Sequence, residues 1–592
     1  MSPYRSETVD RTYWQVLSLV LVVLTVKAVF LLKNMPSMWI WADESYYYVT
    51  AYDLLNLGRL GVPHPGFLYY PPLTSIFISP VHLFALPDSL TYPSSLIILT
   101  VLHATGVVAA YLLVYELFHV RSRLLVLLLL VGSPAYMSLC LMSETPFIAL
   151  FMWLLYFYVR QLKNERARDA LIVGLLVALM MLTRKSGVGV IASLVVSLVL
   201  GAVTEVDPQK RKRIVYLHSL NLVVGLGLAL SWKVFMGAVL EAKHGYYDAA
   251  GYVEHGLLPA LGSVRRFFTL SMKFFANLGY LSLSSYGICV PLLTYFFFTR
   301  HPRDRAEQRL VRQILLFLLV FAVFAAFVAA VHMFINRLSP NPRYYMYGRY
   351  MEYFALPLLA LTFGYLATGV RWTKPQRLVL VLMTALLSLA ILVTLPMPFY
   401  YGTIAKNTVV PNYMGIAWLF GLGGTSVALI LGLSLILPVS LALLLTSRAF
   451  QQRRAVKIGA YLVVLLLAVT NLTMAAASAA EKSRAYDGKF MAFRDFIDAQ
   501  PQLFTAGMYL DLYPPDRKKK KKKMRKADRT DQRYVQRTIA ERADKVMAGN
   551  DPSPYLGAMP VMSRREYHDY EILFTAADTE YRVYGKRIVR EQ

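Results

Sequence analysis

Acidic residues and cysteines are both scarce in this sequence, and each shortage excludes some classes of protein or of site. The two cysteines, Cys140 and Cys289, lie in or at the ends of apolar stretches, so the sequence indicates neither a disulfide framework nor a cysteine-based metal site. Charged residues of both signs make up only 16% of the 592 residues, whereas hydrophobic residues make up 57%. Apolar runs of about 20 residues recur from residue 13 to about 476, which predicts a polytopic α-helical membrane protein.

The few charges are also unbalanced, with 62 Lys and Arg residues against 35 Asp and Glu. Such an excess is compatible with nucleic-acid binding, with contact to anionic lipid, or with the charge distribution that orients a membrane protein. The basic residues fall mostly in short segments between apolar stretches, so topology accounts for most of the excess. We therefore expect membrane lipid, and no nucleic acid, among the partners.

The apolar stretches predict about thirteen membrane-spanning helices. They lie near residues 13–33, 93–118, 122–139, 145–160, 169–183, 188–204, 215–240, 280–299, 313–335, 351–370, 378–396, 413–446 and 457–476. With a cytoplasmic N-terminus, every second loop carries the Lys and Arg clusters that cytoplasmic loops favour. These clusters lie at residues 121–123, 160–168, 210–213, 300–312, 371–377 and 448–457. The prediction is a multi-pass plasma-membrane protein whose C-terminal segment is extracytoplasmic.

The composition changes at about residue 477, which predicts a transmembrane domain over 1–476 and a soluble extracytoplasmic domain over 477–592. We expect the second domain to be small and of the α/β type. Its predicted elements are a strand at 503–513, a helix from about 535 that ends at Gly549, and a hairpin formed by 569–575 and 580–589. The basic run 517–526 is interpreted as a solvated loop, with adhesion to anionic headgroups as the alternative.

Two adjacent carboxylates, Asp43 and Glu44, open a predicted outer loop that spans residues 34–92. There an acidic group can act as a base against a substrate delivered on a lipid. The alternative is that the pair only marks the end of a helix in the headgroup zone. The loop also carries candidate substrate contacts, although tyrosine is common at any membrane interface. These candidates are Tyr47, Arg59, His64, Tyr69 and Tyr70.

Several cations also fall on the predicted outer face, where the topology rule does not require them. They are Arg184 and Lys185 at the end of the fifth predicted span, and Arg343 and Arg349, which share a later outer loop with Tyr345 and Tyr347. Arginine suits phosphate because its planar fork donates two parallel hydrogen bonds. The cluster therefore predicts a site for a lipid-linked phosphate. The alternative is that helix-end cations reach for lipid headgroups.

These segments together carry a family resemblance. In order along the chain they read WADESYYY after the first span, HPGFLYYPPL in the outer loop, SETPF at the fourth span, LTRKSG ending the fifth, and YYMYGRYMEY entering a late span. Over about residues 10–400 this arrangement resembles the GT-C membrane glycosyltransferases, and within them the branch of the protein mannosyltransferases and lipid A aminoarabinose transferases. The resemblance implies transfer of a sugar from a polyprenyl-phosphate donor to a glycan, lipid or protein acceptor on the outer face, usually with inversion.

The resemblance also assigns roles to the acidic residues. Asp43 matches the acidic position that the family has after its first helix, so we expect it to take the proton of the acceptor hydroxyl, with Glu44 sharing or orienting that work. Relatives commonly carry a second carboxylate later in the loop, yet residues 54–87 contain no Asp or Glu. Glu144 is an alternative for that role, unless it only complements the dipole of its helix. Adjacent carboxylates are also suitable ligands for a divalent ion, so the sequence leaves open whether the protein binds a metal.

Two classes without catalysis compete with the enzyme. A secondary transporter would explain the many spans, but it favours charges near mid-membrane and broken helices in paired halves. In this sequence the candidate groups gather on one face. A non-catalytic polyprenyl-lipid-binding protein of envelope assembly would use the same phosphate-binding cations without a base, so the role of Asp43 distinguishes it from the enzyme.

Overall fold

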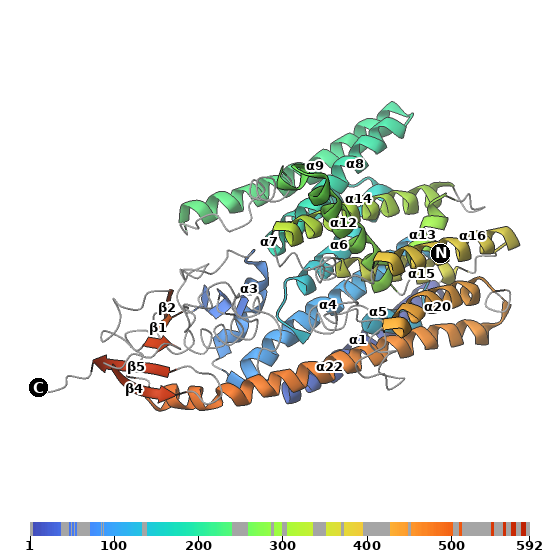
Figure 1. Cartoon of the computed structure of the whole chain (residues 1–592). Coiled ribbons are helices and arrows are strands. Elements are labelled where there is room, and N and C mark those ends of the chain that lie inside the picture. Colours follow the sequence, from blue (N-terminus) through green and yellow to red (C-terminus); the bar gives the residue numbers. More distant parts are fainter. Residues whose placement is uncertain are drawn as a thin grey trace, which may run out of the picture.

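The structure is a computed structural model that describes most of the helical region and short segments of the C-terminal part. The described residues are 4–36, 47–48, 50–52, 54–55, 71–84, 86, 88–132, 139–239, 258–285, 289–298, 305–335, 351–368, 372–394, 427–447, 452–500, 502, 508–511, 546–549, 561–563, 570–575 and 582–587. Helices dominate them, as expected where lipid forces each backbone N–H and C=O to pair within its own segment. The helical architecture predicted from the apolar runs is confirmed (Figure 1).

The first part of the chain forms ten of the described helical segments. They are α1 (Tyr4–Asn34), α3 (Leu73–Ile78), the 3-10 turn η1 (Ser79–Phe84), α4 (Asp88–Phe118), α5 (Arg123–Gly132), α6 (Glu144–Asn164), α7 (Ala167–Thr183), η3 (Lys185–Gly187), α8 (Val188–Thr204) and α9 (Pro208–Val239). The second part adds α11 (Leu258–Leu261), α12 (Val264–Ser284), α13 (Cys289–Phe298), α14 (Arg305–Ile335), η7 (Glu352–Phe354), α15 (Ala355–Ala367), α16 (Lys374–Thr394), α20 (Val427–Thr446) and α22 (Arg454–Ala499).

Five of the described helices are long and apolar enough to cross a membrane. They are Trp14–Asn34, Leu90–Phe118, Glu144–Asn164, Pro208–Trp232 and Gln308–His332, and several shorter apolar helices accompany them. The predicted number of about thirteen spans is not confirmed. Within the predicted span at 280–299, α12 ends at Ser284 and α13 begins at Cys289, and residues 286–288 lie outside the described residues.

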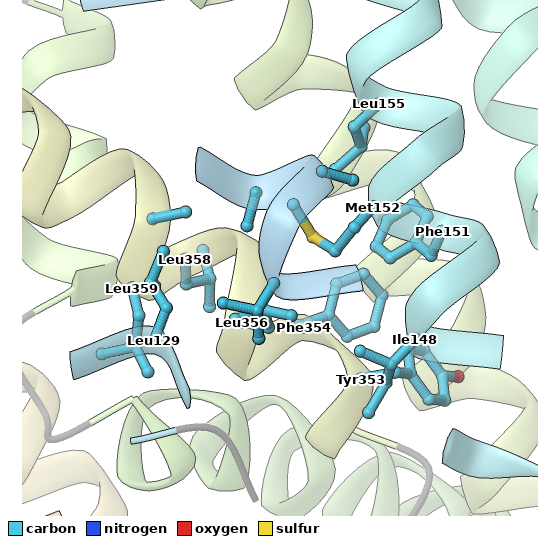
Figure 2. Packing of buried hydrophobic residues seen from close by; sticks show 14 of the residues in the cluster. Leu129, Ile148, Phe151, Met152, Leu155, Tyr353, Phe354, Leu356, Leu358 and Leu359 are labelled. Atoms are coloured by element: carbon cyan, nitrogen blue, oxygen red, sulfur yellow. The ribbon is translucent and has the colours of Figure 1, made fainter. Parts of the chain in front are cut away.

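The core lies where α6 packs against α4 and against the η7–α15 segment. Figure 2 shows Ile148, Phe151 and Met152 of α6 beside Tyr353 and Phe354. Aromatic rings connect these elements, since the Phe147 ring centroid lies 4.9 Å from that of Tyr353. Between α4 and α6 the backbones approach so closely that a Cβ on Gly106 would lie 2.8 Å from the Cα of Ala149. These elements therefore pack closely around the first turns of α6.

One end of the bundle carries cross-helix contacts made by cations. They are Lys163 Nζ to Glu116 Oε2 at 3.1 Å, Arg213 Nη2 to Glu165 O at 2.6 Å, and Arg309 Nη2 to Glu205 Oε2 at 3.0 Å. These contacts join the last turns of α4 and α6, the first turns of α9 and α14, and the residue after α8. We call this the basic end. The grouping agrees with the predicted alternation, because the clusters 160–168, 210–213 and 300–312 contribute to one end.

The C-terminal part contains a five-stranded sheet with the order β2-β1-β3-β5-β4. Its strands are β1 (Met508–Asp511), β2 (Val546–Gly549), β3 (Val561–Ser563), β4 (Tyr570–Thr575) and β5 (Arg582–Arg587). β1 pairs in parallel with β2 and β3, whereas β5 pairs antiparallel with β3 and β4. In Figure 1 the sheet lies toward the end of the bundle opposite the marked N-terminus.

Of the strand predicted at 503–513, residues 508–511 form β1. The antiparallel pairing of β4 with β5 agrees with the predicted hairpin, whose turn lies outside the described residues. The helix predicted to end at Gly549 is wrong at its end, because residues 546–549 form β2. Helix α22 runs without interruption from Arg454 to Ala499 and so passes through position 477. The division of the chain at 477, the outer placement of the sheet and the role of the run 517–526 stay predictions, and that run lies outside the described residues.

Candidate active site

Helix α6 begins at Glu144, at the end of the helix opposite its contacts with the basic end. The sequence SETPF suits a helix start, because a carboxylate in the first turn complements the helix dipole and proline is tolerated in the first turn, where N–H groups lack helical partners. Ser143 occupies the N-cap position, yet its side chain makes no capping hydrogen bond. Its hydroxyl instead accepts a hydrogen bond from Arg184 Nη1 at 3.1 Å.

Helix α7 ends at Thr183, and Arg184 follows in an extended conformation with φ −153° and ψ 145°. The chain then turns through η3 into α8. Gly187 permits this turn, because a Cβ at that position would lie 2.8–2.9 Å from the backbone of Met180 and Met181. The LTRKSG segment is thus a tight reversal that holds the Arg184 side chain over the start of α6.

Arg184 and Glu144 form a buried ion pair between Nη1 and Oε1. Their side chains are 7% and 1% exposed, and Ser143 Oγ lies 3.5 Å from Glu144 Oε2. Two charges at so low an exposure persist only when paired and hydrogen-bonded, since desolvation costs several kcal/mol for each ion. The arrangement places a buried guanidinium and its carboxylate partner at the start of α6.

Buried hydroxyl groups occur in η3 and in α3. Ser186 Oγ in η3, and Thr74 Oγ1 and Ser75 Oγ in α3, are buried and make no hydrogen bond within the described part of the chain. Helix α3 packs against both α4 and α7. Buried polar groups are normally satisfied by protein, water or ligand. These three hydroxyls therefore mark places where a polar ligand or ordered water can bind.

The segment Met351–Phe354 lies against the first turns of α6, as the contact of Phe147 with Tyr353 shows. It carries Glu352, whose side chain is 1% exposed. Glu352 is not among the site residues predicted from the sequence. The available signal was a carboxylate at the start of an apolar span, in the same YYMYGRYMEY segment that carries Arg349.

The described residues around Tyr47 pack against η1. Tyr47 and Tyr48 are each 1% exposed, and the ring of Tyr48 lies edge-on to His82 with centroids 4.8 Å apart. Tyr52 makes a similar contact with His82 at 5.7 Å. The end of the WADESYYY segment is therefore part of the packed core, and the role of Tyr47 in substrate contact stays a prediction.

The structure thus brings Glu144 and Arg184 together, and it describes only the backbone of Lys185. Most of the other predicted site residues lie outside the described residues. These are Asp43, Glu44, Arg59, His64, Tyr69, Tyr70, Arg343, Tyr345, Tyr347 and Arg349. Among the residues that the structure describes, no three His, Cys, Asp or Glu side chains form a group able to hold a metal ion. Because Asp43 and Glu44 are not among them, the possible divalent ion stays open.

Comparisons with known proteins concern the fold and part of the sequence. A family model described as dolichyl-phosphate-mannose-protein mannosyltransferase matches residues 71–232, the stretch that includes Glu144 and Arg184. No curated protein sequence matches the chain. The fold is similar to that of ArnT from Cupriavidus metallidurans bound to undecaprenyl phosphate, with a TM-score of 0.53 and 14% identity over 96% of this chain and 97% of that one. The apo state of that protein matches with a TM-score of 0.51 and 14% identity, over 98% of each chain.

The resemblance to the GT-C membrane glycosyltransferases is therefore confirmed in fold and in the family model.

Proposed function

We propose that the chain transfers a sugar from a polyprenyl-phosphate donor to an acceptor hydroxyl on the extracytoplasmic face of the membrane, with inversion at the sugar carbon. The observation that carries the proposal is the buried pair of Arg184 and Glu144, held at the ends of α6 and α7 remote from the basic end. A guanidinium at that end, in a chain of this fold, suits a phosphate attached to a lipid. That ArnT was solved with undecaprenyl phosphate supports the same class of donor.

The proposed reaction is a single displacement. Asp43 accepts the proton of the acceptor hydroxyl while the acceptor oxygen forms a bond to the anomeric carbon. The bond from that carbon to the phosphate oxygen breaks, and the phosphate leaves on the lipid with the bonding electron pair. Arg184, together with Arg343 and Arg349, stabilises the charge that develops on this phosphate. Glu144 keeps Arg184 oriented and neutralises its charge before the donor binds.

A direct assay tests the proposal with the full chain in lipid nanodiscs. We expect release of polyprenyl phosphate from a polyprenyl-phosphate sugar only when an acceptor is present, with inverted configuration in the product. Mass spectrometry of lipid-linked sugars and envelope glycans, with and without this chain, identifies the sugar and the acceptor. Donor binding without release under all acceptors would instead support the non-catalytic lipid-binding protein, and movement of an intact solute across the bilayer would support the transporter.

Arg349→Ala is expected to weaken donor binding while the response to excess acceptor changes little. Loss of a charge-assisted contact in a partly desolvated site costs about 1.5–3 kcal/mol, or about 10- to 150-fold in affinity. Lysine should restore only part of it, since a point charge does not reproduce the fork of the guanidinium. Titration with a non-hydrolysable lipid-phosphate analogue measures the effect. Unchanged affinity in both Arg349→Ala and Arg343→Ala would reduce this cluster to headgroup anchors.

The orientation is tested by labelling in intact cells. In a chain whose two native cysteines are replaced by serine, a cysteine at position 572, which is exposed on β4, should react with a membrane-impermeant maleimide. A cysteine at position 212, exposed near the start of α9 at the basic end, should react only after the membrane is permeabilised. Labelling of 212 with protection of 572 would reverse the proposed topology.

A further inference from the structure

Helix α12 begins with a turn whose residues are all exposed. Residues 261–268 join α11 to the first residues of α12, and each of them is open to the surroundings. On either side of this stretch, Ala260 and Leu270 pack in one small hydrophobic cluster with Ala330 and Val331 of α14. The segment is therefore held against α14 at both ends while the residues between stay exposed. We call residues 261–268 the exposed turn.

The contacts with α14 determine the depth of the exposed turn. Ala330 and Val331 lie at the end of the apolar span Gln308–His332, whose first residues include Arg309 of the basic end. Arg266 precedes Leu270 by four residues, which is about 6 Å along a helix. The exposed turn thus lies at the end of the bundle opposite the basic end, at the level where an apolar span meets the lipid headgroups.

Four side chains of the exposed turn are large and apolar. Val264 and Phe268 are 81% and 66% exposed, and Leu261 and Phe267 are 58% and 50% exposed. In water such a group of apolar side chains is unfavourable, whereas at a membrane surface it inserts into the boundary between headgroups and acyl chains. The apolar residues of the turn are therefore suited to insertion into the interface.

Two cations lie between these apolar residues. Arg265 and Arg266 are both exposed, and the ion pairs found in the described part of the chain include neither of them. The charge alternation that orients a membrane protein accounts for cations at the basic end but not for these. A guanidinium donates two parallel hydrogen bonds to a phosphate, and its methylene stem tolerates apolar surroundings. Such a contact is made by the two side chains themselves, and residues 240–257 and 336–350 lie outside the described residues.

We propose that the exposed turn inserts into the membrane interface at this end of the bundle and binds the phosphate groups of anionic phospholipids through Arg265 and Arg266. The apolar residues Val264, Phe267 and Phe268 hold the turn at the depth at which both guanidinium groups reach headgroup phosphates. The proposal does not depend on the function of the Glu144–Arg184 site.

The first experiment measures depth with the full chain in nanodiscs. Both native cysteines are replaced by serine, and Phe268→Cys carries a spin label. The label should be reached by oxygen more readily than by a water-soluble nickel chelate, at a depth of about 5–10 Å below the phosphates. A label on Lys212→Cys, at an exposed position of the basic end, is the aqueous control. Equal access of the chelate to both labels would overturn the proposal.

The second experiment measures lipid preference by native mass spectrometry, with phosphatidylglycerol and phosphatidylcholine as the probes. Phosphatidylglycerol should be retained in preference to phosphatidylcholine. Arg265→Gln and Arg266→Gln should each reduce this preference about 5-fold, and the double variant about 30-fold, as expected for cations at a charged membrane surface. The double variant Phe267→Ser with Phe268→Ser should reduce it as well, because the arginines remain but the turn no longer inserts.

Arg484→Gln is the matched control, since Arg484 is exposed on α22 about 21 Å beyond the apolar stretch that ends at Thr470. It should leave the preference unchanged. An equal loss in Arg484→Gln and Arg266→Gln would reflect general surface charge and overturn the proposal, as would equal retention of the two lipids. Spin–spin broadening between labels at position 268 would instead assign the turn to contact between two copies of the chain, which also overturns it.

Discussion

Asp43→Asn is expected to slow sugar transfer by about 10²- to 10⁴-fold, the usual contribution of a positioned general base, while donor affinity changes little. The amide is close to the carboxylate in size but cannot accept the proton of the acceptor hydroxyl. Donor binding depends on the phosphate, which the proposed mechanism assigns to arginines. Single-turnover transfer with a lipid-phosphate sugar measures the rate, and titration with a non-hydrolysable analogue measures the affinity.

Three further measurements test whether the slower transfer in Asp43→Asn comes from the loss of a general base. The wild-type rate should fall on acidification as the carboxylate takes up a proton, and that acidic limb should disappear in Asp43→Asn. Glu44→Gln should lower the rate less, and Glu481→Gln, an exposed acid on α22, should not lower it. Near-normal turnover of Asp43→Asn combined with a large loss in Glu144→Gln would move the base to Glu144.

Arg184→Ala is expected to destabilise the protein by about 3–5 kcal/mol, because it leaves the Glu144 carboxylate buried without its partner. Thermal and chemical unfolding of the purified chain in detergent measures the loss. The pair of Lys163 and Glu116 is the matched control, since its side chains are 34% and 29% exposed. Lys163→Ala should cost no more than about 1 kcal/mol, as exposed pairs do.

A double variant separates the structural role of Arg184 from its role in binding. Glu144→Leu combined with Arg184→Met replaces two charges by apolar groups of similar size, so much of the lost stability should return. Donor affinity should remain low, because no guanidinium is present to hold the phosphate. Recovery of stability together with normal donor affinity would restrict the pair to a structural role and remove Arg184 from the phosphate site.

The positions of Glu144 at the start of α6 and of Arg184 at the end of α7 follow from local patterns in the sequence. A carboxylate and a proline in the first turn predict the start of α6 at Glu144, and an arginine before a Lys-Ser-Gly turn predicts the end of α7. The pairing of the two does not follow, because the partners are 40 residues apart and meet only through the way α6 packs on α7. The sequence therefore predicts a separate role for each, Glu144 as an alternative base and Arg184 as a phosphate ligand, although the structure joins them.

There are also physical reasons why the sequence does not indicate Glu352 and predicts the wrong structure for residues 546–549. Glu352 sits within an apolar segment, and nothing in its neighbours' periodicity distinguishes a buried carboxylate from an interfacial one. The apolar residues before 546 recur at helical spacing, and this pattern predicts a helix that extends over residues 546–549. They form β2 because they pair in parallel with β1, almost 40 residues earlier in the chain. Such distant pairing is decided by tertiary context, which overrides local preference.

The length of α22 has a mechanical consequence. Its 46 residues extend about 70 Å at 1.5 Å per residue, more than twice the thickness of a hydrocarbon core of about 30 Å. In Figure 1 this continuous helix extends from the apolar helices toward β4 and β5. Ile497 near its end and Val583 of β5 are both buried and belong to the same hydrophobic core. Each residue inserted into such a helix would rotate the part of the chain that follows the insertion by about 100° about the helix axis and move it by about 1.5 Å along that axis. The number of residues in α22 therefore determines the direction in which the chain leaves this helix toward the sheet.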